Sequence, residues 1–168
     1  EILDFLKIQP GENGLDATLR YGGHTSKMLE CLKGSGHITA LDVDPIESVK
    51  TTERLRNLGY GEDVLTVKHI NFANIDEVAA EQGKFDFVLA DLGVSSMQID
   101  NPERGFTYKE EGPLDLRMNP RKGISAAERL KEVNVFELQQ MLEDYSDEPY
   151  AKEIAREILN RRKRGNAI

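Results

Sequence analysis

The stretch Phe85-Asp-Phe-Val-Leu-Ala-Asp-Leu-Gly-Val-Ser-Ser-Met-Gln98 decides the fold of this chain. It begins as an apolar run short enough for a buried parallel strand and breaks at Asp91 into a loop that carries glycine, serines and an amide. In open α/β sheets, ligands bind beyond the carboxyl ends of the strands. The sequence therefore places Asp91 on the edge of a sheet where a ligand would lie.

Three further strands are expected before this one. Apolar stretches at residues 15–19, 37–42 and 64–70 alternate with segments that have helical spacing. In the helix after the second of these strands, Asp44 suits the N-cap and Pro45 the first helical position. The alternation predicts an α/β fold, a doubly wound parallel sheet with right-handed crossovers.

The pattern changes after Gln98. Residues 100–123 are rich in Asp, Asn, Pro, Gly and Arg, which indicates a long functional loop. Signals for helix starts follow at Ser125 with Glu128, at Asn134 with Glu137, and at Asp147 with Pro149. We therefore expect a core with a substrate loop over residues 1–123 and a helical portion over residues 124–168.

Two features near the first two strands point to a nucleotide-like ligand. Gly22 and Gly23 let the backbone approach a ligand, and the helix that follows presents free N–H groups. The same glycines also suit a plain tight turn, because their spacing is not G-x-G-x-x-G. Asp42, about 20 residues further on, stands where nucleotide-binding folds accept hydrogen bonds from ribose hydroxyls. Asp44 competes for that role, although its position favours a helix cap.

The composition limits the class of protein. The chain has 168 residues, 39% of them hydrophobic, which is enough for one buried core and an appendage. Its single cysteine, Cys31, favours a reducing compartment, and we interpret it as buried filler. No apolar run approaches the roughly 20 residues that span a bilayer, so we expect a soluble, cytoplasmic protein. The net charge of −8 confines any contact with nucleic acid to local basic clusters.

Two further expectations concern metals and the ends of the chain. The three histidines, His24, His37 and His69, are scattered, so the sequence predicts no metal site. The chain starts at Glu1 rather than at methionine and stops directly after a basic helix end, which indicates an incomplete chain.

Five motifs of the chain are informative when taken together. They are Asp16-Ala-Thr-Leu-Arg-Tyr-Gly-Gly-His24, Asp42-Val-Asp-Pro45, Asp91-Leu-Gly-Val-Ser-Ser-Met-Gln98, Glu103-Arg-Gly-Phe106 and Gly112-Pro-Leu-Asp-Leu-Arg-Met-Asn-Pro120. This set resembles one family, the bacterial 16S ribosomal RNA cytosine-N4 methyltransferases of the RsmH/MraW type. The resemblance covers nearly the whole chain. One departure is Arg20, where many relatives carry glycine.

The resemblance implies a class I, Rossmann-like methyltransferase with S-adenosylmethionine as cofactor and a decoding-centre cytosine of 16S ribosomal RNA, free or in the small ribosomal subunit, as methyl acceptor. The implied cofactor contacts are Gly22, Gly23 and His24 at the methionine end, Asp42 at the ribose, Phe72 at the adenine, and Asp91 with Gln98 in the rest of the pocket. The helices from about Ser125 would begin the family's inserted helical domain, which helps to hold RNA. Because the family's chain continues past this insert, the fourth strand is expected at a sheet edge.

Asp91 is our candidate catalytic residue. A cytosine amine is a poor nucleophile because its lone pair is delocalised, and an acceptor beside it would localise the lone pair. Asp91 would serve as that acceptor or would hold the donor sulfonium. Around the base, Ser95 and Ser96 would shape the site. The loop residues that would either contact RNA or be ordinary solvated surface residues are Arg104, Phe106, Tyr108, Arg117, Arg121 and Lys122.

Alternatives remain open at this point. Arg161 to Arg164 suit either phosphate binding or the ordinary positive charge at a helix C-terminus. A nicotinamide-dependent oxidoreductase shares the strand, glycine turn, helix and acid, but lacks the Asp91 motif. A noncatalytic module that binds RNA or a partner is the third hypothesis.

Overall fold

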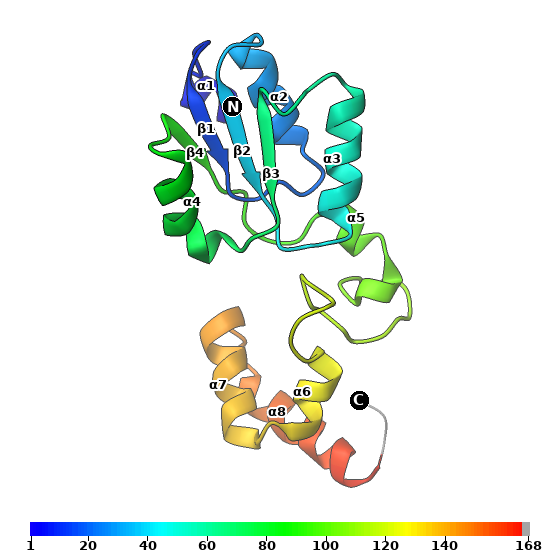
Figure 1. Cartoon of the computed structure of the whole chain (residues 1–168). Coiled ribbons are helices and arrows are strands. Elements are labelled where there is room, and N and C mark those ends of the chain that lie inside the picture. Colours follow the sequence, from blue (N-terminus) through cyan, green and yellow to red (C-terminus); the bar gives the residue numbers. More distant parts are fainter. Residues whose placement is uncertain (166–168) are drawn as a thin grey trace. The chain divides into compact units, whose positions relative to one another are not determined.

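Four parallel strands and the helices between them form the first part of the computed structural model, which describes residues 1–165 (Figure 1). The strands are β1 (Asn13–Asp16), β2 (His37–Leu41), β3 (Leu65–Lys68) and β4 (Phe87–Leu89). Their order in the sheet is β3-β2-β1-β4, and every neighbouring pair is parallel. The predicted α/β fold with a doubly wound parallel sheet is therefore confirmed.

The strand order places a topological switch point beside β1. The chain moves outward from β1 to β2 and β3, and then crosses back to add β4 on the other side of β1. Asp16, the last residue of β1, is in register with Ala40 of β2 and with Leu89 of β4. The carboxyl ends of these three strands therefore meet at one edge, which is where ligands bind in such sheets.

Two apolar layers cover the sheet. One face packs against α1 (Ile2–Leu6), α2 (Gly23–Leu32) and α3 (Glu47–Asn57), and the other packs against α4 (Ile75–Gln82). Ile38 and Leu41 belong to different layers because successive side chains of a strand point to opposite faces. Cys31 packs against the first layer, as the sequence predicts for a filler residue.

The chain divides into two compact units between Gln98 and Ile99. The first unit ends within α5 (Ser96–Ile99). The second contains the 3-10 helix η2 (Pro102–Arg104) and three helices, α6 (Ala126–Glu132), α7 (Val135–Ser146) and α8 (Ala151–Lys163). Its apolar core includes Val133, Leu138 and Ala155.

The expected boundary at residues 123 and 124 differs from this division. The long loop goes with the helices because the backbone N–H groups of Ala126 and Ala127 donate to Asp115 and Leu114, both at 2.8 Å. These two bonds join the end of the loop to the start of α6. The loop therefore belongs to the helical unit and not to the sheet.

Two of the three predicted helix starts in this unit are confirmed. Ser125 and Glu128 form a complete capping box, and the Asn134 side chain accepts from the Glu137 backbone N–H at 3.0 Å. The prediction at Asp147 is wrong, because Asp147 has a left-handed φ of 49° and ends α7. The next helix begins at Ala151.

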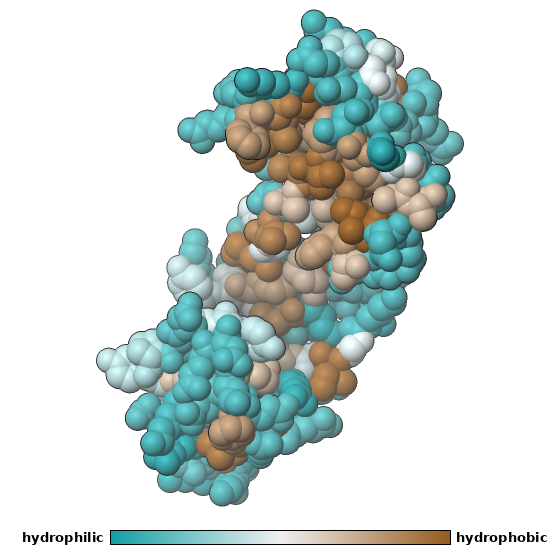
Figure 2. All heavy atoms as spheres, turned by 90° about the vertical axis from the view of Figure 1, so that its left-hand side faces the viewer, coloured by the Kyte–Doolittle hydropathy of each residue, from teal (hydrophilic) through white to brown (hydrophobic). Residues whose placement is uncertain are grey.

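β4 lies at the edge of the described sheet, as expected. Its middle residue, Val88, is 50% exposed, and Leu92 in the following loop is 67% exposed. Figure 2 views the first unit from the side of β4 and α4, and apolar atoms gather on this face. This strand therefore presents an unpaired, partly apolar edge.

None of the helices within residues 1–165 has the length and apolar character needed to cross a membrane.

Candidate functional site at the carboxyl edge of the sheet

Three acidic side chains lie at one edge of the sheet. Asp16 ends β1, Asp42 directly follows β2, and Asp91 lies two residues after β4. Hydrogen bonds through Thr18 connect two of them, because its backbone N–H donates to Asp16 Oδ1 at 3.0 Å and its hydroxyl oxygen accepts from the Asp91 N–H at 2.8 Å. The structure thus brings together the acidic residues at the ends of three strands, among them Asp42 and Asp91, which the sequence places at this edge.

Arg20 connects the other pair of carboxylates. Its backbone N–H donates to Asp42 Oδ2 at 2.8 Å, and its guanidinium Nη1 donates to Asp91 Oδ2 at 3.0 Å. The Arg20 carbonyl accepts from the Thr51 hydroxyl at 2.6 Å, so α3 also fixes the loop. Arg20 therefore spans the space between the ends of β2 and β4.

The backbone at Arg20 is strained. Its φ is 49°, in the left-handed region, which costs a residue with a side chain roughly 1–2 kcal/mol. The side chain is 20% exposed, and its Nη2 is buried without a hydrogen-bond partner among the described residues. The ion pair with Asp91 offsets part of both costs.

The glycine turn leads into the N-terminus of α2. Gly22 has a φ of 70° and stands at the N-cap without a side-chain cap, so the first-turn N–H groups lack intrahelical partners. A Cβ placed on Gly23 would meet no atom within 4 Å, which leaves open space beside the helix start. His24, 43% exposed, has its Nδ1 3.7 Å from Asp91 Oδ2. The turn therefore combines free donors, space and a neighbouring carboxylate.

Burial changes the acidity of two of the carboxylates. Burial raises the pKa of the Asp16 carboxyl above its ordinary 3.8, against hydrogen bonds from Thr25 and Thr18 that lower it. Burial also raises the pKa of Asp42 from 3.8, against backbone hydrogen bonds from Asp44 and Arg20. Both groups are held by donors that fix their orientation.

Asp44 and Gln98 form a buried pair next to this edge of the sheet. Asp44 Oδ1 accepts from the Ile46 and Glu47 backbone N–H groups at 2.9 and 3.2 Å, so Asp44 holds the turn that leads into α3. The predicted helix start is two residues too early, because Ile46 and not Asp44 is the N-cap and α3 begins at Glu47. The Gln98 amide donates to Asp44 Oδ2 at 3.0 Å, and its oxygen accepts from the Ser95 N–H at 2.9 Å. Gln98 is only 3% exposed. Its amide is thus engaged within the protein.

The remaining predicted residues of the first unit differ in exposure. Ser95 is buried, and its hydroxyl oxygen accepts from the Gln98 backbone N–H at 3.2 Å. Ser96 is exposed. Phe72, 46% exposed, lies in the 3-10 helix η1 (Phe72–Asn74) after the end of β3. Ser96 and Phe72 are therefore accessible, whereas Ser95 has a local structural role.

In the second unit, the two loop motifs that contain Arg104 and Arg117 pack against each other through glycines. A Cβ on Gly105 would lie 2.4 Å from the Pro113 carbonyl oxygen, and one on Gly112 would lie 2.2 Å from the Pro102 carbonyl oxygen. Such close backbone approach requires glycine at both positions. The Glu-Arg-Gly-Phe and Gly-Pro-Leu-Asp motifs therefore form one structure.

Two arginines fix the shape of this loop. Arg104 Nη2 donates to the carbonyls of Arg117 and Met118 at 3.1 and 2.9 Å. Arg117 makes a two-pronged ion pair with Asp115, in which Nε donates to Oδ1 at 2.9 Å and Nη2 donates to Oδ2 at 2.5 Å, and this guanidinium lowers the pKa of Asp115 from 3.8. Phe106 is partly buried, and Tyr108 is 94% exposed.

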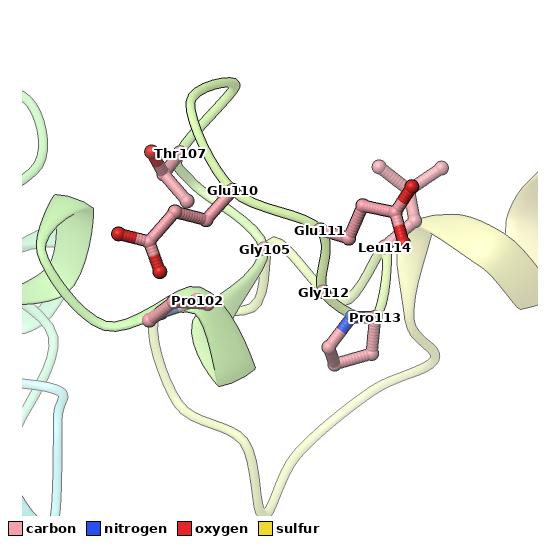
Figure 3. Close-up of a pocket in the computed structure, with 8 residues that line it drawn as sticks. All are labelled: Pro102, Gly105, Thr107, Glu110, Glu111, Gly112, Pro113 and Leu114. Atoms are coloured by element: carbon pink, nitrogen blue, oxygen red, sulfur yellow. The ribbon is translucent and has the colours of Figure 1, made fainter.

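A cavity of about 550 Å³ lies within this loop (Figure 3). In Figure 3, Thr107 and Glu110 lie next to each other on one side, and Glu111 and Leu114 lie on the other. The two carboxylates suit a ligand that carries an amine and disfavour a phosphate. The remaining lining residues are Pro102, Gly105, Gly112 and Pro113.

The basic end of α8 is partly occupied by contacts within the protein. Arg162 Nη1 donates to the carbonyls of Leu130, Lys131 and Val133 at 2.8 to 2.9 Å, and Arg161 pairs with Glu157 at 2.9 Å. Of the two interpretations given by the sequence, a structural role therefore holds for Arg162. Lys163 and Arg164 remain exposed.

Sequence reasoning missed three threonines that organise the site. Thr18 connects Asp16 to Asp91, Thr25 donates to Asp16 Oδ2 at 2.6 Å, and Thr51 holds the Arg20 carbonyl. Thr25 had a detectable signal, because it is a hydroxyl residue two positions after Gly23 of the glycine turn. The histidines are not clustered, and the described residues contain no group of three or more potential metal ligands.

Comparison with known proteins gives a consistent family. A sequence model described as the MraW methylase family matches residues 1–167. The chain is 68% identical over 168 residues to "Ribosomal RNA small subunit methyltransferase H 1" of Lachnoclostridium phytofermentans, which covers 100% of this chain and 46% of that protein. It is 62% identical over 168 residues to the protein of the same name from Agathobacter rectalis, with 100% and 48% covered. The chain thus spans about half the length of the curated relatives it matches.

Proposed function

Because this chain belongs to the MraW methylase family, we propose that it carries the donor pocket of an S-adenosylmethionine-dependent methyltransferase that modifies N4 of a cytosine in 16S ribosomal RNA. The substrate is the free RNA or the small ribosomal subunit. Because this substrate is in the cytoplasm, the proposal implies a cytoplasmic protein. The observation that carries the proposal is the meeting of Asp42, Asp91 and the glycine turn at the switch point of the sheet.

The residues at this edge fit the proposed cofactor. The open space beside Gly23 and the free N–H groups of the α2 N-terminus suit the carboxylate of the methionine end. Asp42 lies after β2, where an acid accepts from ribose hydroxyls, and the exposed ring of Phe72 offers a stacking face for adenine. Gln98 would contribute indirectly, through the hydrogen bond that its amide donates to Asp44.

Asp91 would act on the methyl acceptor. When bound, S-adenosylmethionine supplies a methyl group already activated by its sulfonium, so the main task of the protein is alignment, which can contribute roughly 7–11 kcal/mol. The Asp91 carboxylate, 40% exposed, is accessible for a hydrogen bond from the cytosine amine. That bond would localise the lone pair of the amine. Ser96 would contact the base.

Contact with RNA would come from the second unit. The cytosine has to leave its stack, which costs a few kcal/mol. Phe106 and the exposed Tyr108 offer rings for stacking, and Lys163 and Arg164 offer charge to phosphates. Arg104 and Arg117 would contribute by fixing the loop, since they bond to its backbone and to Asp115.

Equilibrium binding tests the cofactor. We expect the chain to bind S-adenosylmethionine and not NAD in calorimetric titrations, and Asp42→Asn to weaken that binding. Asp63→Asn, at an exposed acid before β3 and thus at the opposite edge of the sheet, is the matched control and should leave binding unchanged. Preferential binding of NAD would support the oxidoreductase hypothesis and overturn the proposal.

Transfer of a labelled methyl group tests the reaction. We expect label from S-adenosylmethionine to appear as N4-methylcytidine in small-subunit RNA, and Asp91→Asn to reduce the rate. If RNA binds at saturating donor and no label is transferred, the chain is a noncatalytic RNA-binding module. If Asp91→Asn keeps both cofactor affinity and turnover, the role given to Asp91 is wrong.

A further inference from the structure

Arg20 places a permanent positive charge in the proposed donor pocket. Guanidinium groups carry a positive charge in proteins, and that of Arg20 lies 3.0 Å from the Asp91 carboxylate at the switch point. The backbone of Arg20 is fixed from two sides, by Asp42 and by Thr51, so the side chain starts from a defined position. The charge is therefore a built feature of this edge and not a mobile surface group.

We propose that Arg20 determines which form of the cofactor this pocket prefers, by favouring the neutral thioether product, S-adenosylhomocysteine, over the cationic donor. The inference rests on the proposed function. It concerns relative affinity for two ligands and does not require that the chain transfers a methyl group.

The preference follows from the charges of the two ligands. The donor and the product differ by one methyl group and one positive charge, and they share every other group. A free Asp91 carboxylate would attract the sulfonium cation, whereas a carboxylate already paired with Arg20 offers little net attraction. His24, the other group that faces Asp91, lies further away at 3.7 Å. Arg20 thus cancels the charge that would otherwise select the donor.

The left-handed backbone at Arg20 allows the charge to be removed by substitution without loss of the fold. Glycine adopts a φ of 49° readily, so Arg20→Gly should keep the path of the loop. Arg20→Gln retains a long side chain and the strained backbone but removes the charge. Arg20→Lys retains the charge. The three variants therefore separate charge from shape.

The measurement is the ratio of the dissociation constants of S-adenosylmethionine and S-adenosylhomocysteine, by calorimetry on the full chain. We expect Arg20→Gly and Arg20→Gln to shift this ratio toward the donor by on the order of tenfold, and Arg20→Lys to stay near the parent. A general distortion of the pocket weakens both ligands and leaves the ratio unchanged. Arg54→Gln is the matched control. Arg54 also carries a guanidinium, which lies 3.7 Å from the centroid of the ring of Tyr21, the residue that follows Arg20, and it is not bonded to Asp91.

Each outcome of these titrations either supports or overturns the inference. A shift in both uncharged variants, with none in Arg20→Lys or Arg54→Gln, supports the inference. An unchanged ratio in the uncharged variants overturns it while the proposed function stands. A shift in Arg20→Gly alone also overturns it, because the backbone and not the charge would then be responsible. If neither ligand binds to any variant, the proposed function fails and the inference fails with it.

Discussion

The Thr25 hydroxyl donates to the Asp16 carboxylate across 2.6 Å and thereby ties the end of β1 to the first turn of α2. Both side chains are almost fully buried, with 1% of Asp16 and none of Thr25 exposed. The bond fixes the glycine turn relative to the sheet. The Asp16 carboxylate is poorly solvated in this position, and its burial raises its pKa above 3.8.

Asp16→Asn should change how stability depends on pH. A raised pKa in the folded state means that the contribution of Asp16 to stability is present below 3.8 and is lost as the pH rises through the folded-state value. Asparagine stays neutral, so the free energy of unfolding of the variant, minus that of the parent, should increase with pH across this window. Urea unfolding at a series of pH values measures it, and a difference that does not vary with pH would contradict the prediction.

Glu81→Gln provides a control of opposite sign. The hydrogen bond from Lys68 lowers the pKa of Glu81 below 4.5, so its contribution is present above 4.5 and is lost as the pH falls through the folded-state value. The difference between variant and parent should therefore become more negative as the pH rises. Its amplitude should be small because the Glu81 side chain is 63% exposed.

Gln98→Leu should destabilise the first unit by about 1–3 kcal/mol. The substitution leaves Asp44 Oδ2 and the Ser95 N–H, both buried, without the bonds that Gln98 makes. Denaturant unfolding measures the loss. Ser96→Ala in the same short helix is the control and should stay within about 0.5 kcal/mol, because Ser96 is exposed. Equal stability of Gln98→Leu and the parent would show that this pair has no net structural role.

The sequence predicts the parallel sheet because each strand is a short apolar run with its own turn or helix signals. Helix caps at Ser125 and Asn134 are equally predictable from the sequence, since a cap depends on residues within three or four positions. Asp147 fails for the same local reason. Its residue type suits an N-cap, yet Asp also tolerates the left-handed conformation that ends α7.

The site was predictable only in part. Acids after parallel strands must share an edge, so the meeting of Asp42 and Asp91 follows from the strand pattern. The bonds that hold them do not. Arg20 and Asp91 lie 71 positions apart, and Asp44 and Gln98 lie 54 apart, so both pairs depend on strand order and on rotamers that periodicity does not specify. Likewise, the bonds from the loop to α6 decide the boundary between the units.

Gly112→Ala should undock the two motifs of the long loop. A Cβ at this position would lie 2.2 Å from the Pro102 carbonyl oxygen, and backbone cannot rotate away as a side chain can. Overpacking of this kind costs typically about 1–3 kcal/mol. Hydrogen exchange should speed up at the N–H of Leu116, which donates to the Arg104 carbonyl at 3.2 Å. Glu111→Ala, at the exposed neighbour, should leave exchange unchanged, and equal rates in both variants would refute the docking.

Arg162 and its exposed neighbours should have separable roles. Arg162→Gln removes a charged donor from three carbonyls at the end of α6, so it should destabilise the second unit by about 1.5–3 kcal/mol. Lys163→Gln with Arg164→Gln should leave thermal unfolding nearly unchanged, because both side chains are exposed.

Affinity for RNA should depend on Lys163 and Arg164 and not on Arg162, which is the reverse of the effects on stability. If Lys163 and Arg164 contact phosphates, the slope of log affinity against log salt should fall by roughly 0.7 to 0.9 per contact in their double variant. Arg162→Gln, measured at a temperature where it stays folded, should keep the parental slope, since its guanidinium already bonds to Leu130, Lys131 and Val133. A reduced slope in Arg162→Gln alone would mean that this guanidinium leaves the carbonyls to bind phosphate, and the structural role assigned to it would be wrong.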